Sequence, residues 1–156
     1  MKVMFVCSAN TCRSAMAEAI FKDIMDDDIE VFSCGISAES GRGPSPKTIE
    51  VCKNHGIDIT NHKATYFRQS DIEDMDLVLT ASEFHKEKLK IYYKDLDIYT
   101  IREFCKEYPF DINDPYGASI EVYNACFEEI SRLLNKIKSK MLSEDLSLEE
   151  YLENIK

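Results

Sequence analysis

The sequence has no long apolar run, and its 156 residues carry only 19 lysines and arginines against 29 aspartates and glutamates. A helix that crosses a membrane needs about 20 consecutive apolar residues, so we expect neither a spanning segment nor a membrane partner. The formal net charge of −10 makes most of the surface repel nucleic-acid phosphates, which argues against a nucleic-acid partner. A small basic pocket within such an acidic surface would still be compatible with a phosphorylated ligand.

The six cysteines include no CxxC pair and no cysteine–histidine cluster with the spacing of zinc ligands, so no metal site is expected. Residues 1–7 form a short apolar run without a small-residue cleavage site, and we interpret them as a buried strand rather than a signal peptide. We therefore expect a protein of the reducing cytoplasm. Cys34, Cys52 and Cys126 fall in apolar stripes and are interpreted as core residues.

Apolar segments typical of strands alternate with segments of helical periodicity. Four strands are expected, at residues 2–6, 29–34, 76–80 and 97–101. Four helices are expected, at residues 14–25, 46–55, 82–90 and 119–141. Ser14, Ser82 and Ser119 are placed to cap three of these helices, while Pro46 and Gly56 suit the start and the end of the second.

Strands that alternate with helices are joined by right-handed crossovers into a parallel sheet. The chain therefore predicts a three-layer α/β domain with a four-stranded parallel twisted sheet and helices on both faces. No repeat, linker or low-complexity segment interrupts it, so residues 1–156 are expected to form one domain. Residues 61–74 are polar and predicted to be irregular, and residues 142–156 could form an extra C-terminal helix or tail.

The strongest motif lies between the first strand and the first helix and reads Cys7-Ser8-Ala9-Asn10-Thr11-Cys12-Arg13-Ser14. Ligand sites of α/β sheets lie at this carboxyl edge. A loop that opens a helix there points successive backbone N–H groups inward and forms a nest for an anion. The Cys7 sulfur would lie at the floor of the nest, and the Arg13 fork would match two phosphate oxygens. We therefore predict that the loop binds phosphate or another oxyanion.

The same nest would activate the cysteine. A thiol is mostly protonated at neutral pH, but a helix N-terminus and a nearby cation stabilise the thiolate. The Ser14 hydroxyl is also placed to donate a hydrogen bond to the sulfur. Cys7 is therefore expected to attack phosphorus and form a phosphocysteine, which water then hydrolyses. Neither a metal nor another cofactor is needed for these two steps.

The leaving group needs a proton, and Asp114 in the run Asn113-Asp114-Pro115-Tyr116 is the candidate donor. The proline holds the preceding aspartate in an extended conformation, so that the loop can reach over the nest. Bound phosphate would favour the protonated carboxyl group. Asp111, three residues earlier, is the alternative acid.

The run from Val6 to Glu18, with Asp114-Pro115-Tyr116 far downstream, resembles the low-molecular-weight protein tyrosine phosphatases, and the similarity extends to about residue 141. The resemblance implies a four-stranded parallel sheet, phosphorylated protein substrates and no metal. It also implies the roles given above for the cysteine, the arginine and the aspartate. The substrate-binding residues would be Ser8, Ala9, Asn10, Thr11, Cys12, Ser14 and Tyr116.

A narrower resemblance is to the protein-arginine phosphatase branch, which carries a threonine at the position of Thr11 and one aromatic residue followed by small residues after Asp-Pro. Tyrosine-directed members usually have a second aromatic residue at the position of Gly117. We therefore expect phosphoarginine as the substrate, with phosphotyrosine as the alternative. The family has glycine at the position of Ala9, and we expect the alanine to be tolerated because it is the smallest replacement.

Two other functions are less consistent with the sequence. Arsenate reductases share the fold and the loop, but they need a further redox cysteine pair, and residues 82–94 contain no cysteine. A non-catalytic module that only binds phosphorylated residues would be expected to have lost Cys7, Arg13 or Asp114, and all three are present.

Cys12 is a candidate redox partner of Cys7, because a curled loop can bring both sulfurs to one side and a disulfide would protect an oxidised Cys7. It could equally be a small residue that fills space between loop and helix. The histidines are given no catalytic role, since His55 ends a helix, His85 lies in a charged helix and His62 lies in a loop. His62 could support the nest from outside.

Overall fold

The fold was obtained as a computed structural model that describes residues 1–156, and its centre is a four-stranded parallel sheet in the order β2-β1-β3-β4. The strands are β1 (Lys2–Cys7), β2 (Glu30–Gly35), β3 (Leu77–Thr80) and β4 (Ile98–Thr100). All four lie where the sequence predicted them. Because the strands are parallel, their carboxyl ends meet at one edge of the sheet.

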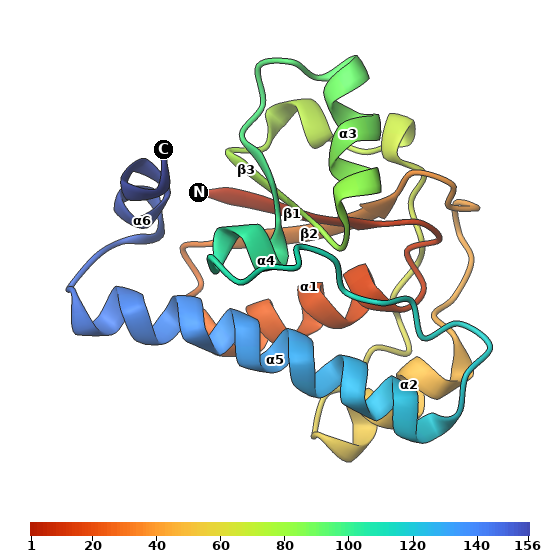
Figure 1. Cartoon of the computed structure of the whole chain (residues 1–156). Helices are drawn as coiled ribbons and strands as arrows, with labels where there is room; N and C mark the ends of the chain where they lie inside the picture. The colour runs from red at the N-terminus through yellow and green to blue at the C-terminus, as the bar shows by residue number, and fades with distance from the viewer.

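Helices cover both faces of this sheet, as predicted (Figure 1). They are α1 (Arg13–Ile24), α2 (Pro46–Asn54), α3 (Glu83–Tyr92), α4 (Ile101–Phe104), α5 (Ile120–Ser143) and α6 (Leu148–Ile155). Figure 1 shows α1 and α5 on one side of the strands and α3 on the other. The segment predicted to be irregular contains two short 3₁₀ turns, at Phe67–Gln69 and Ile72–Asp74, and one isolated bridge from Tyr66 to Gly35. No helix has the length and apolar character needed to cross a membrane.

Alternating side chains of β1 divide the core into two layers, as expected for a strand buried on both faces. Val3 and Phe5 belong to the larger layer, which packs against α1 and α5. Met4 and Val6 belong to the smaller layer under α3. The ring of Phe5 meets that of Phe21 edge-on, with centroids 5.4 Å apart and an interplanar angle of 81°. This packing fixes α1, and therefore the loop that precedes it, against the central strand.

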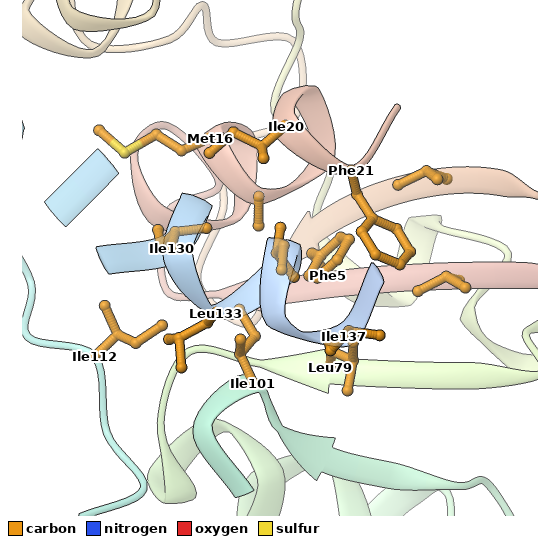
Figure 2. Packing of buried hydrophobic residues seen from close by; sticks show 14 of the residues in the cluster. Phe5, Met16, Ile20, Phe21, Leu79, Ile101, Ile112, Ile130, Leu133 and Ile137 are labelled. Atoms are coloured by element: carbon orange, nitrogen blue, oxygen red, sulfur yellow. The ribbon is translucent and has the colours of Figure 1, made fainter. Parts of the chain in front are cut away.

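The long helix α5 closes the larger layer. Figure 2 shows Ile130, Leu133 and Ile137 of α5 among the side chains that contact the sheet and α1. Burying one such side chain contributes about 1.5–3 kcal/mol. The three cysteines interpreted as core residues are indeed buried, and burial raises the pKa of Cys34, Cys52 and Cys126 to about 12.

The C-terminal helix α6 is packed onto the same layer near β4. Leu148, Tyr151 and Leu152 are buried there, and the Tyr151 hydroxyl donates a hydrogen bond to the Phe104 carbonyl at 3.1 Å. A capping box of Ser147 and Glu150 begins this helix.

Two predicted caps differ in the structure. Helix α1 begins at Arg13 with Cys12 at its N-cap, so the prediction of Ser14 as the cap is wrong. Ser14 lies inside the first turn, because its hydroxyl is used by the loop instead. Ser119 occupies the N-cap position of α5 but forms no side-chain cap, whereas Ser82 caps α3 as predicted by accepting from the His85 N–H group. Helix α4, a single turn with its own capping box, was not predicted.

Candidate active site

The loop between β1 and α1 lies at the carboxyl edge of the sheet and is held in shape by Asn10. This residue is fully buried and has φ 59°, a left-handed conformation that asparagine tolerates better than most residues. Its side-chain amide donates to Ser14 Oγ at 2.7 Å and to Ser33 Oγ at 2.9 Å. Its side-chain oxygen accepts from the Thr65 N–H group at 3.0 Å. The left-handed residue of the loop is therefore Asn10 and not Ala9, which removes the conformational objection to an alanine at that position.

The sulfur of Cys7 lies against the start of α1. Cys7 Sγ is 2.9 Å from Ser14 Oγ, and it accepts from the Ser14 N–H group at 3.4 Å. Since the Asn10 amide already donates to Ser14 Oγ, the serine hydroxyl hydrogen is free to point at the sulfur. Two donors, the hydroxyl and the N–H group of Ser14, thus converge on the Cys7 sulfur.

The guanidinium of Arg13 is buried and anchored from the opposite loop. One terminal nitrogen donates to the Ile112 carbonyl at 2.9 Å, and the other lies 3.6 Å from Asp114 Oδ2. The Asp114 side chain is 50% exposed, so its carboxyl group can meet both the arginine and a ligand. Asp111 is engaged elsewhere, since its carboxylate accepts from the Glu83 N–H group at 2.8 Å at the start of α3.

These groups surround a cavity of about 270 Å³. Its lining comprises Cys7, Ser8, Ala9, Thr11, Cys12, Arg13, Arg42, Asp114 and Tyr116. The structure therefore brings the predicted nucleophile, arginine and acid to one cavity, together with most of the predicted binding residues. Asn10 and Ser14 do not line it and instead hold the loop from behind. Arg42 was not found from the sequence, because it comes from the loop after β2 and belongs to no local motif.

Cys12 lines the cavity beside a second set of polar groups. Its sulfur is 3.3 Å from Ser45 Oγ and 3.8 Å from both Thr11 Oγ1 and the Tyr123 hydroxyl. Burial and the contact with Cys12 raise the pKa of Tyr123 to about 12, so this phenol stays protonated. Cys7 and Cys12 therefore line the same cavity, but their sulfurs contact different polar groups.

His85 contacts the loop, which the sequence analysis did not anticipate. The imidazole is buried, with Nε2 2.9 Å from Ser8 Oγ and Nδ1 2.8 Å from Ser82 Oγ. Burial first, and then the nearby positive charge of Arg13, lower the pKa of His85 to about 4, so the ring is neutral at pH 7. The sequence feature that could have indicated this contact is the position of His85 in the first turn of a helix, which starts at the same edge of the sheet as the loop.

His62 supports the loop from outside. Its Nε2 lies 2.7 Å from the Asn10 carbonyl, and its Nδ1 lies 3.8 Å from Glu18 Oε1. His55 lies elsewhere, stacked on Phe127 with ring centroids 4.1 Å apart. No group of three or more histidine, cysteine, aspartate or glutamate side chains is arranged to hold a metal ion.

Comparison with known proteins places this geometry in context. A family model described as "Low molecular weight phosphotyrosine protein phosphatase" matches residues 2–148. The low molecular weight protein-tyrosine-phosphatase PtpB of Staphylococcus haemolyticus is 37% identical over 140 residues, which cover 89% of this chain and 99% of that protein. The protein-arginine-phosphatase of Bacillus subtilis is 32% identical over 151 residues, which cover 93% of this chain and 99% of that protein.

A solved structure adds a chemical detail. A mutant of the YwlE arginine phosphatase, described as carrying a phosphorylated active site serine, superposes with a TM-score of 0.84 and 29% sequence identity. The match covers 90% of this chain and 95% of that one. The relatives thus carry the names of two substrate classes.

Proposed function

This chain belongs to the low molecular weight phosphotyrosine protein phosphatase family of cysteine-based hydrolases, and we propose that it hydrolyses phosphoarginine side chains of proteins through a phosphocysteine at Cys7. The observation that carries this proposal is the meeting of Cys7, Arg13 and Asp114 at one small cavity, with the Ser14 hydroxyl against the sulfur.

In the first step, the Cys7 thiolate attacks phosphorus, so that an S–P bond forms while the P–N bond to the guanidinium breaks. Asp114 gives its proton to the departing nitrogen. The backbone N–H groups of the loop and the Arg13 guanidinium neutralise the equatorial oxygens, which is the main contribution of the protein to a loose transition state. The bond from Arg13 to the Ile112 carbonyl fixes the orientation of that guanidinium.

In the second step, water attacks the phosphocysteine, and the S–P bond breaks. The Asp114 carboxylate takes a proton from the water, and inorganic phosphate leaves. Cys7 returns as a thiolate, which the Ser14 hydroxyl and N–H group stabilise. Every bond that forms and breaks is accounted for by these side chains and water.

The mouth of the cavity supports the choice of phosphoarginine. Tyr116 is 76% exposed and is followed by Gly117 with φ 77°. A bulky aromatic residue would be strained in that conformation, so the backbone itself disfavours a second ring that would stack on a phenyl group. Thr11 contributes a polar side chain to the lining of the cavity. Phosphotyrosine stays the alternative substrate, since Tyr116 alone can still contact an aromatic ring.

Paired turnover tests this proposal. Two peptides of one sequence, with phosphoarginine or phosphotyrosine at the same position, should be compared by kcat/KM with the purified protein. We expect the phosphoarginine peptide to have the higher value. A higher value for the phosphotyrosine peptide would assign the chain to the alternative substrate, and Cys7→Ser serves as the inactive control for both.

A further inference from the structure

A second cavity opens beside the first, at the segment that leads into α2. It has a volume of about 330 Å³ and lies between residues 42–47 and the rings of Tyr116 and Tyr123. Thr11, Arg42 and Tyr116 line both cavities. The side chain of a residue next to the phosphorylated one could therefore enter this space while the phosphoryl group occupies the loop.

The charges that face this side cavity are positive and lack acidic partners. Among the five arginines, Arg13, Arg102 and Arg132 are ion-paired, and Arg68 lies over the ring of Tyr92. Arg42 is exposed, and its guanidinium forms neither a hydrogen bond nor an ion pair within the chain. Arg42 is thus the one arginine without a charged or aromatic partner in the chain, and it lines the active-site cavity, where a ligand anion could pair with it.

Lys47 supplies the second positive charge. Its ammonium donates to the Ala118 carbonyl at 2.5 Å and lies 5.8 Å from the ring centroid of Tyr123. These neutral contacts position the ammonium on the wall of the side cavity without cancelling its charge. The backbone at the start of α2 offers few N–H donors to an anion in the side cavity. Pro46 has no N–H group, and the Thr48 N–H group already donates to the Ser45 side chain.

We propose that this side cavity is a subsite for an anionic side chain next to the phosphorylated residue of the substrate, bound by Arg42 and Lys47. The ligand chemistry is a carboxylate or a second phosphate, since a planar guanidinium and an ammonium recognise both. The inference rests on the proposed phosphatase function, but not on which residue carries the phosphate. The subsite would favour substrates with an acidic residue beside the phosphorylated one, although the phosphatase itself carries a negative net charge.

Four peptides that differ only beside the phosphorylated residue test the subsite. This neighbouring residue should be Glu, phosphoserine, Gln or Lys, and kcat/KM should be measured for each. We expect the Glu and phosphoserine peptides to exceed the Gln peptide by about 3–10-fold, the range for a few partly exposed ion pairs, and the Lys peptide to be poorer than the Gln peptide. The Glu and phosphoserine arms distinguish the two anion sources.

Variants separate the subsite from a general charge effect. Arg42→Gln and Lys47→Gln should each reduce the preference for Glu over Gln, and the double variant should remove it. Lys94→Gln is the matched control, because Lys94 is exposed on the segment before β4, at the opposite end of the sheet, and it should keep the wild-type preference.

Equal kcat/KM for the Glu and Gln peptides in the wild type, or an unchanged preference in the double variant, would overturn the subsite while leaving the phosphatase function intact. Failure of the wild type to hydrolyse any of the four peptides would overturn the proposed function, and the subsite with it.

Discussion

Two aspartates of one loop have different partners, and this difference favours Asp114 over Asp111 as the proposed acid. Asp114 lines the cavity beside Cys7 with Oδ2 3.6 Å from Arg13, whereas Asp111 accepts from the Glu83 N–H group. We predict that Asp114→Asn lowers kcat by about 10²–10⁴-fold, the usual contribution of a positioned acid. The loss should be smaller for a substrate with a good leaving group, because such a group departs without a proton.

Asp111→Asn is the matched control, and its kcat should stay near that of the wild type. Steady-state kinetics of both variants on one peptide substrate and on one aryl phosphate test which of the two aspartates is the acid. If Asp111→Asn were the more damaging change, the acid would have been assigned to the wrong residue.

The buried His85 predicts a pH dependence of stability. Its pKa of about 4 in the folded protein lies below the ordinary value of 6.5, so the unfolded chain binds more protons between these two pH values. The free energy of unfolding should therefore decrease as the pH falls from about 6.5 to about 4. In His85→Gln, which hydrogen-bonds but does not titrate, the decrease should be smaller.

Urea unfolding of the wild type and His85→Gln at several pH values between 4.5 and 7 measures this effect. The kcat of the variant at pH 7 serves as a second readout, because the ring also contacts Ser8 of the loop between β1 and α1. Parallel stability curves for the two proteins would show that His85 is not the group responsible.

The residues of the site differ in how far the sequence could reveal them. Cys7, Arg13 and Ser14 lie within eight consecutive positions, so their spacing after a strand predicted their neighbourhood. His85 reaches Ser8 across 77 positions, and Arg42 comes from the loop after β2. Such contacts depend on which strands are neighbours in the sheet, and hydrophobic periodicity carries no information about that.

At the scale of elements, the regular spacing of apolar residues predicted the positions of the strands and the long helices to within a few residues. Helix α4 was missed because four residues are too few to show a helical period. The cap of α1 was predicted wrongly for a chemical reason. Ser14 had two possible uses, and the Cys7 sulfur holds its hydroxyl in the structure.

The loop between β1 and α1 also leads to a prediction about redox behaviour, which depends on Cys12. Both sulfurs border one cavity, and a thiolate at Cys7 would be the first group that peroxide attacks. A disulfide with Cys12 would trap the sulfenic acid and release water, and a dithiol could then reduce it. We predict that mild peroxide followed by dithiothreitol restores activity in the wild type, and that Cys12→Ser loses activity permanently.

Inorganic phosphate at saturating concentration provides the control, because it should protect both proteins from peroxide by occupying the loop. Equal recovery of the wild type and Cys12→Ser would show that Cys12 only packs between the loop and α1, near Ser45 and Tyr123.

At the scale of the whole molecule, strand order brings the site together. The order β2-β1-β3-β4 places β1 inside the sheet, so the loop after β1 has neighbours on both sides. The segment after β2 supplies Arg42, the turn after β3 leads into the helix with His85, and the loop beyond β4 supplies Asp114. Strand order therefore gathers Arg13, Arg42 and Asp114 at one edge of the sheet.

The most direct test of the proposed mechanism is a rapid-mixing experiment on the phosphoenzyme. The protein is mixed with excess phosphoarginine peptide, quenched with denaturant within the first turnover, and digested for mass spectrometry. We predict phosphate on the peptide that contains Cys7, formed at the rate of the initial burst and absent when Cys7→Ala replaces the wild type. Turnover without any phosphocysteine, or with phosphate on another residue, would contradict the account.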